Sequence, residues 1–409
     1  MKFPFLGPAY EARSLPFAAQ RSVNLYLEYA PPESQNTDGQ IMYGTPGLKL
    51  FANLTTGGGI RGQYKTAKGR YFTVSGNILY EVNSSGIETN LGTINTTIGT
   101  VSMVDNGSEL LIVDGFNGYL LTLTTNTLLE INTTNFPNSG GFPSSPTHAG
   151  FLDQFFLVNQ LNTQDFFISG LLDGTTWNAL DFGTAESNPD IIESFLITNQ
   201  NIWLLGSNGV EVFQDTGNND FPMERIPGAI IERGILARYS AAKMNDSIFW
   251  LGRSEQGIGS IYKSVNFQSQ RISTHPIERK INEMSTPEDA VGYTYELEGH
   301  PVYTLSFQAD EMTFCYDEVT GVWHEKAYLQ PSTGNLKKHR GINAISAFNK
   351  VLVGDHSKPL IYEFDTNTYD DNGDRIPRIR TCQHIDSDEK RVRHNSLQIV
   401  METGVGLTS

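Results

Sequence analysis

Pairs of apolar, strand-like runs joined by short turns recur along this 409-residue chain at a spacing of about 40 to 50 residues. These pairs occupy residues 69–91, 107–131, 152–170, 195–217, 244–265, 299–325 and 348–368. Each pair has the pattern of a β-hairpin. A repeat of this length is typical of the four-stranded blade of a β-propeller, because one blade cannot bury both of its faces until neighbouring blades stack on it.

This repeat predicts an all-β chain that folds as a β-propeller of six or seven blades over residues 61–370. Two packed β-sandwiches would give similar hairpins and remain the alternative fold. Residues 1–60 contain proline and glycine breakers and predict an extended N-terminal arm with short strands. Residues 371–409 predict the start of a further C-terminal β domain that is truncated, because the last alternating strand would have no partner for its ladder.

The charge of the chain restricts its partners. Acidic residues outnumber basic ones, 45 to 29, which gives a net charge of −16. A protein that binds nucleic acid tightly needs clustered Lys and Arg against the phosphates, so tight DNA binding is not expected. An acidic or neutral wall repels phosphates, however, and would suit a passage along which DNA slides without being held.

The apolar runs and the cysteine content of the sequence indicate the kind of compartment in which the chain folds. No run of about eighteen apolar residues is present, so the sequence predicts no membrane-spanning helix. Two cysteines, Cys315 and Cys382, are too few for a disulfide framework in a chain of this length, and we expect both to be free thiols of a reducing compartment.

Three short matches to functional motifs are better explained as turns. Gly57, Gly59 and Gly62 have the spacing of a dinucleotide-binding loop, but no apolar strand precedes them. Residues 368–373 match part of a calcium loop, yet the position of its bidentate glutamate is an isoleucine. Residues 169–177 approach the Asp-box turn of sialidase-type propellers, which marks a blade turn rather than a catalytic group. The sequence therefore predicts neither a metal nor a cofactor.

Three long strings resemble one known family. TTWNALDFGTAESNPDII (175–192), FPMERIPGAIIERGILARYSAA (221–242) and IFWLGRSEQGIGSIYKSVNFQSQRISTHPIERKI (248–281) resemble the packaged-DNA stabilization proteins, the tail-hub family of short-tailed phages such as P22. The N-terminal strings AYEARSLPFAAQRSVNLYLEY and YGTPGLK fit the same family, so the resemblance covers most of the chain.

The resemblance implies a structural function without catalysis. Such proteins form a ring, usually a hexamer, beneath the portal and its adaptor protein. They help to retain the packaged genome, carry the tail needle and the tailspikes, and form part of the channel for genome ejection. The implied location is the virion tail, assembled in the host cytoplasm, and the implied relation to DNA is passage without tight binding.

Residues 250–281 combine many charged side chains with glycines and hydroxyls, which would suit either acid–base catalysis or a structural contact. In the family that the chain resembles, the R-I-S-T-H-x-I-E string (residues 271–278) is a recurring signature without attached chemistry. On a strand, Arg271, Ser273 and His275 would share one face, while Ile277 and Ile281 fit the start of an apolar helical stripe. We therefore expect a subunit or inter-domain contact formed by Arg253, Arg271, His275, Glu278 and Arg279.

A carbohydrate-binding or carbohydrate-active propeller is the alternative function. Asp173, Asp181 and Glu186 lie near Trp177 in the sequence, and an aromatic ring beside carboxylates can bind a sugar. Hydrolysis would need two carboxylates that face each other about 5 to 9.5 Å apart in a pocket.

Overall fold

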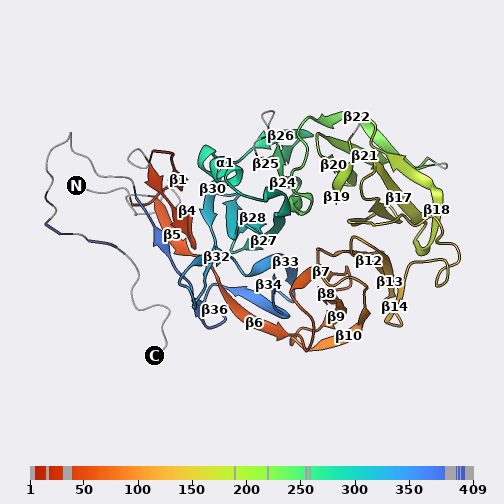
Figure 1. Cartoon of the computed structure of the whole chain (residues 1–409), viewed down its shortest axis with the longest axis horizontal. Coiled ribbons are helices and arrows are strands. Elements are labelled where there is room, and N and C mark those ends of the chain that lie inside the picture. The colour runs from red at the N-terminus through yellow and green to blue at the C-terminus, as the bar shows by residue number, and fades with distance from the viewer. Residues whose placement is uncertain are drawn as a thin grey trace.

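The computed structural model shows seven antiparallel blades, each built on four strands and arranged in a ring (Figure 1). The structure describes residues 5–14, 18–30, 39–187, 190–218, 221–253, 257, 259–382, 393, 395–396 and 398–400. The predicted all-β propeller is therefore confirmed, and the number of blades is seven.

The first four blades follow one another along the chain. Blade 1 consists of β7 (Ile60–Lys65), β8 (Tyr71–Ser75), β9 (Ile78–Val82) and β10 (Glu88–Thr93). Blade 2 consists of β11 (Ser102–Asp105), β12 (Glu109–Val113), β13 (Gly118–Thr122) and β14 (Thr127–Glu130). Blade 3 consists of β15 (Ala149–Leu152), β16 (Phe155–Asn159), β17 (Asp165–Gly170) and β18 (Asp173–Thr184). Blade 4 consists of β19 (Ile192–Thr198), β20 (Asn201–Gly206), β21 (Val210–Asp215) and β22 (Met223–Ile231).

The last three blades complete the ring. Blade 5 consists of β23 (Ala242–Met244), β24 (Ser247–Arg253), β25 (Gly259–Val265) and β26 (Gln268–Arg271). Blade 6 consists of β27 (Val291–Leu297), β28 (His300–Phe307), β29 (Met312–Asp317) and β30 (Val322–Glu325). Blade 7 consists of β33 (Gly341–Ala347), β34 (Lys350–Asp355), β35 (Leu360–Asp365) and β6 (Gly47–Asn53). The first strands of neighbouring blades contact each other around the ring, and β33 contacts β7.

A separate apolar core fills each of the seven seams between neighbouring blades. Strand β12 shows why the central strands are apolar at consecutive positions. Leu110 and Ile112 pack toward blade 1, whereas Leu111 and Val113 pack toward blade 3, because successive side chains of a strand point to opposite faces. Both faces of a blade are therefore buried, which produces the strong hairpin signal in the sequence.

The ring is closed by a strand from the N-terminal segment. β6 pairs antiparallel with β35, so it supplies the fourth strand of blade 7 although it lies within the 1–60 segment that sequence patterns assign to the arm. Its buried Leu48 joins the core between blades 6 and 7, and Ala52 joins the core between blades 7 and 1. The two ends of the ring are thus held together by a pairing between segments about 300 residues apart.

The segments outside the blades gather on one side of the ring, at the left of Figure 1. The arm contains β1 (Tyr10–Glu11), β2 (Ala19–Gln20), β3 (Ser22–Val23), β4 (Leu25–Tyr29) and β5 (Gln40–Gly44). The C-terminal segment contains β36 (Asp370–Asp371), β37 (Asp374–Arg375) and β38 (Ile379–Arg380). Most of the expected C-terminal β domain, residues 371–409, lies outside the described residues.

Strand β3 connects the arm to the rest of the molecule, because it pairs in parallel with β30 and antiparallel with β38. Between blades lie the helix α1 (His275–Asn282), the short 3₁₀ helices η1 (Arg238–Ser240) and η2 (Pro287–Asp289), and the hairpin of β31 (Ala327–Leu329) and β32 (Leu336–Lys338). Cys315 is buried in blade 6 and Cys382 is partly buried, and both are free thiols.

Closure by β6 predicts a large difference between two leucines of this strand. Leu48 is fully buried, whereas Leu50 is 46% exposed. We expect Leu48→Ala to lower the free energy of unfolding by about 2 to 5 kcal/mol, because a cavity forms between blades 6 and 7. Leu50→Ala is the matched control and should change it by less than about 0.5 kcal/mol. Urea unfolding followed by tryptophan fluorescence measures both, and equal effects would contradict closure by β6.

Candidate functional site

Helix α1 is the element that positions most of the predicted contact residues. It begins after Thr274 with a proline in its first turn, which suits the unpaired N–H groups there. Ile277 and Ile281 are buried against blades 5 and 6, as the apolar helical stripe predicts. Arg279 and Lys280 lie in the last turn, where cations interact favourably with the helix dipole. The buried face fixes the helix on the ring, and the charged face is turned toward the arm.

The carboxylate of Glu278 ties α1 to the last strand of blade 5. The guanidinium of Arg271, at the end of β26, donates to both of its oxygens, with 2.5 Å between Nε and Oε1. Ser273 Oγ also donates to Oε1, at 2.6 Å. The hydrogen bond to Glu278 raises the pKa of Arg271. His275 Nδ1 lies 3.9 Å from Oε2, and its side chain is 82% exposed. Arg271, His275 and Glu278 therefore come together.

A second carboxylate, that of Glu325 in β30, binds the arm. Arg21 from the arm donates to it with Nε at 3.1 Å and Nη2 at 2.7 Å, in the bidentate geometry that fixes orientation as well as distance. Lys280 of α1 donates to the same carboxylate at 2.8 Å and lies 3.3 Å from the carboxylate of Glu11 in the arm. Blade 6, α1 and the arm thus meet at a single network of two acids and two bases.

The electrostatics of Glu325 agree with this geometry. Burial would raise the pKa of its carboxyl, but the hydrogen bond from Arg21 and the positive charges of Lys280 and Arg21 outweigh burial, so the pKa is lowered. Breaking such a pair by removing one partner leaves an uncompensated buried charge, which costs more than an exposed pair would. The network therefore fixes the position of the arm.

The other two predicted residues lie in different places. Arg279 faces the arm, with Nη2 3.4 Å from the carbonyl oxygen of Glu11, and its Nε lies 3.8 Å from Glu283. Arg253 is exposed at the end of β24, opposite Gly259 on the neighbouring strand. Among the described residues Arg253 has no hydrogen bond or ion pair with the other four. Whether these residues also contact a second subunit stays a prediction.

Sequence reasoning missed Arg21, Lys280, Glu325 and Glu11 as members of the contact. Arg21 and Glu325 are 304 positions apart, and no local pattern links them. The only available signal was the position of Lys280 within the charged string that also contains Glu278 and Arg279.

Two of the three carboxylates of the carbohydrate alternative, those of Asp173 and Asp181, are engaged in local turns, whereas Glu186 is exposed. Asp173 accepts hydrogen bonds from Thr175 and Thr176, and these outweigh the burial that would raise its pKa, so the pKa is lowered. Asp181 accepts from Asn178. The indole of Trp177 is buried and donates to the carbonyl oxygen of Gly174, so its ring face is not available for a sugar. This turn is therefore a structural part of blade 3.

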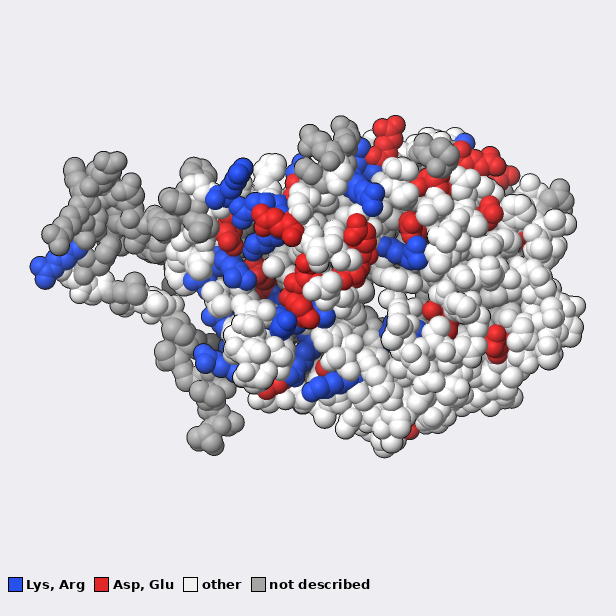
Figure 2. Space-filling view, viewed as in Figure 1, with Lys and Arg blue, Asp and Glu red and all other residues white. Residues whose placement is uncertain are grey.

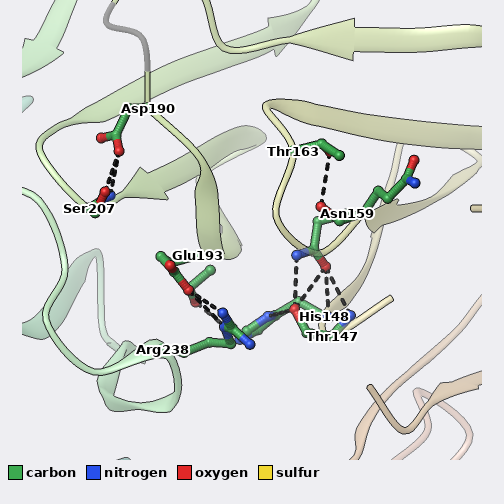
Figure 3. A network of polar contacts seen from close by, with 10 residues as sticks. Thr147, His148, Asn159, Thr163, Asp190, Glu193, Ser207 and Arg238 are labelled. Carbon is green, nitrogen blue, oxygen red and sulfur yellow. Dashed lines mark hydrogen bonds and ion pairs between the residues drawn. The ribbon is translucent and has the colours of Figure 1, made fainter. Parts of the chain in front are cut away.

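A polar network ties together the loops near the centre of the ring (Figure 3). His148 is buried, with Nδ1 2.9 Å from Thr147 Oγ1 and Nε2 3.1 Å from Ser194 Oγ. Burial, together with the charge of Arg238, lowers the pKa of His148 to about 3, so the ring is neutral. Arg238 of η1 donates to Glu193 of β19, with Nε at 2.9 Å.

Helix η1 reaches across the centre of the ring. Tyr239 stacks on His148 with 5.3 Å between ring centroids, and a Cβ at Gly115 of blade 2 would lie 4.0 Å from its hydroxyl oxygen. The carbonyl oxygen of Ser240 accepts a hydrogen bond from Tyr303 of blade 6, at 2.8 Å. Figure 2 shows a narrow hollow at the middle of this face. η1 therefore bridges blades that lie on different sides of the ring.

Neither a metal centre nor a membrane helix stands out in the described part of the chain. No group of three or more His, Cys, Asp or Glu side chains there could hold a metal ion. None of the helices described is long and apolar enough to cross a membrane.

Comparison with known proteins gives one family and a set of distant folds. The family model described as "Bacteriophage P22 Gp10, beta-propeller" matches residues 1–369. No curated protein matches the chain. Among solved structures, the extracellular domain of a putative hybrid two-component system from B. thetaiotaomicron has a TM-score of 0.52 at 9% identity, over 78% of this chain and 40% of that chain. YCF48 from Cyanidioschyzon merolae has a TM-score of 0.49 at 12% identity, over 78% of this chain and 98% of that chain.

These structural likenesses concern the propeller fold alone. The chain spans about two fifths of the length of the bacterial sensor chain, and the identities are low. The likeness to the sensor domain is a likeness of fold and carries no information on ligand or partner.

The network around Glu325 predicts that acid loosens the arm. Because the pKa of Glu325 is lower in the folded chain, its contribution is fully present above the unfolded value of about 4.3 and is lost as the pH falls through the folded value. We expect the hydrogen-exchange protection factors of residues 18–29, that is, the rates corrected for the intrinsic pH dependence of exchange, to be constant from pH 7 down to about pH 5 and to fall below about pH 4.3, relative to those of the ring.

Two variants test this assignment. Glu325→Gln should make hydrogen exchange of the backbone amides in the arm fast at pH 7 as well, because Arg21 and Lys280 lose the carboxylate that they share. Glu283→Gln, at an exposed carboxylate directly after α1, is the control and should leave the arm protected. An arm that stays protected in Glu325→Gln would show that the network does not hold it.

Proposed function

The chain belongs to the Bacteriophage P22 Gp10 β-propeller family, whose members are structural phage proteins, and on this premise we propose that it is the tail hub of a short-tailed virion. In this role it forms a ring, of six copies by resemblance, between the portal adaptor protein above and the tail needle and tailspikes below. It is assembled in the host cytoplasm, helps to retain the packaged DNA and forms part of the ejection channel. The family match over residues 1–369 carries the proposal.

The charge of the chain supports passage of DNA without binding. With a net charge of −16 the chain offers few cations that could release counterions from phosphates, so DNA moving past it is not held. Because η1 bridges blades 2 and 6, the centre of a single propeller is not open to a duplex. The passage proposed here therefore lies between the copies of a ring and not through any one of them.

The rigid attachment of the arm supports a scaffold function. The arm is paired with blade 6 through β3 and is held by Glu325, so surfaces on the arm and on the ring keep a fixed relation to each other. A hub needs such a relation, because it presents one face to the adaptor and another to the needle and spikes. The carbohydrate alternative has no comparable support, since Trp177 is buried.

Particles that lack this protein test the proposal directly. Packaging is driven at the portal, so we expect heads to fill normally in its absence and then to lose their DNA, because nothing seats the component that blocks the channel. Electron microscopy and the nuclease sensitivity of the released DNA measure filling and loss. Addition of the purified hub and needle proteins together should restore retention better than either alone. Filled heads that remain stable without this protein would contradict the proposal.

The charge argument predicts weak, non-specific binding to duplex DNA. At about 0.15 M salt we expect a dissociation constant weaker than about 1 μM, since acidic residues outnumber basic ones, 45 to 29, and the chain as a whole repels the phosphates. Fluorescence anisotropy with a labelled duplex measures this, and an unrelated basic protein serves as the positive control. Sub-micromolar binding would show that the passage holds DNA instead of letting it slide.

A further inference from the structure

Basic residues are distributed very unevenly along the chain. Residues 71–224 contain no Lys or Arg but 17 of the 45 Asp and Glu residues, so all 29 basic residues lie outside this stretch. The stretch forms the strands from β8 to β21 and therefore most of blades 1 to 4. Figure 2 shows the result on one face, where blue side chains gather on the half of the molecule that carries the arm. The chain is thus electrostatically asymmetric from one side of the ring to the other.

The cation-free side carries an exposed aliphatic residue on a built bulge. Strand β18 is the outer strand of blade 3, and its register with β17 shifts between the pairs Phe167–Phe182 and Ser169–Trp177, so residues 178–181 bulge from the sheet. Asn178 shapes the bulge, because its Oδ1 accepts from the N–H of Leu180 at 3.1 Å and its Nδ2 donates to Asp181 at 3.2 Å.

The bulge presents an apolar side chain to the outside. Leu180 is 80% exposed, and Phe182, two positions along the strand, is 40% exposed. Bulges re-aim side chains and are common at sheet edges, and a large apolar group held outward at such an edge is typical of a contact surface. We call Leu180 and Phe182 with residues 178–181 the β18 knob.

The opposite end of the molecule has complementary chemistry. In Figure 1 the β4–β5 hairpin of the arm lies at the left and β18 at the right. Tyr29 and Tyr43 of this hairpin are exposed, and Tyr43 packs on Tyr26 with 5.8 Å between ring centroids. The exposed Arg378 lies against Gly44 of the same hairpin. We call this surface the arm face. Tyr and Arg are the residue types enriched at the centres of protein interfaces.

We propose that the β18 knob of one copy docks on the arm face of the next copy. The exposed leucine of the knob can pack on the tyrosines of the arm face. The arginine of the arm face meets a side of the ring that has no Lys or Arg, so electrostatic complementarity fixes which surfaces meet. The two surfaces differ, so the contact is heterologous, and repetition of a heterologous contact generates a ring when its rotation closes. This inference rests on the ring of the proposed function and names the surfaces that build it.

Sedimentation velocity of point variants tests whether the knob is used. Leu180→Asp should shift the assembled protein to monomer at micromolar concentration, because it places a charge in the apolar contact. Leu180→Met keeps the apolar surface and should assemble as the wild type does. Ile98→Asp is the matched control, since Ile98 is 82% exposed between β10 and β11, outside the residues of both surfaces, and should not change assembly. Assembly of Leu180→Asp equal to that of Ile98→Asp would overturn the proposal.

Disulfide trapping tests which surface receives the knob. In a Cys382→Ser background, Leu180→Cys alone and Tyr43→Cys alone should give no covalent dimer under mild oxidation on non-reducing gels, because Cys315 is buried and like surfaces do not meet. A mixture of the two should give a cross-linked dimer, and the double variant a ladder of higher species. Trapping of Leu180→Cys with itself would show that like surfaces meet and would overturn the proposal.

The remaining outcomes separate this inference from the proposed function. If sedimentation shows a ring but no disulfide forms between positions 180 and 43, the proposed pair of docking surfaces is wrong, whereas the proposed hub function stands. A chain that stays monomeric at every concentration would count against both. Leu180→Lys that assembles normally but gains affinity for duplex DNA would show that the cation-free side faces DNA, which would also overturn the docking proposal.

Discussion

The fold depends on the fact that every blade must bury both of its faces. Each of the seven seams holds its own apolar core, and a central strand such as β12 divides its side chains between two of them. No blade is therefore stable alone, and an open ring would expose the seam faces of its first and last blades. β6 removes this exposure by pairing with β35, so Leu48 and Ala52 contribute to the last two seams. The closing strand thus decides whether the ring is one cooperative unit.

The features that sequence patterns could predict are those whose cause is local. The hairpin repeat reflects strands buried on both faces, and the α1 stripe of Ile277 and Ile281 reflects burial of one helix face, so both can be recognised within a window of a few residues. The clustering of Arg271 with Glu278 is also local, because only seven positions separate them. Closure by β6 and the pairing of Arg21 with Glu325 join segments about 300 positions apart, and a single sequence carries no signal for such contacts.

The charged string around α1 illustrates how a composition suited to catalysis can serve attachment. Glu278 is engaged by Arg271 and Ser273, and Glu325 by Arg21 and Lys280, so each buried carboxylate already has its partners. A general acid or base needs access to a substrate and a pKa near the working pH, whereas the pKa of Glu325 is lowered by its partners. The same contacts that lower the pKa of Glu325 orient the arm, because bidentate geometry specifies direction as well as distance.

The distribution of cations joins these observations to the proposed role of the chain. Among the described Lys and Arg residues, several are engaged in contacts within the chain, as Arg21, Lys280 and Arg271 are. Where they are absent, from residue 71 to residue 224, the charged side chains are 17 carboxylates among hydroxyl, amide and aliphatic groups. A hub that DNA passes must bind its protein neighbours firmly and DNA weakly. The absence of basic groups from residues 71–224, which form most of blades 1 to 4, meets both requirements for the proposed hub, because charge then selects the neighbouring surface without creating a stripe that would retain the genome.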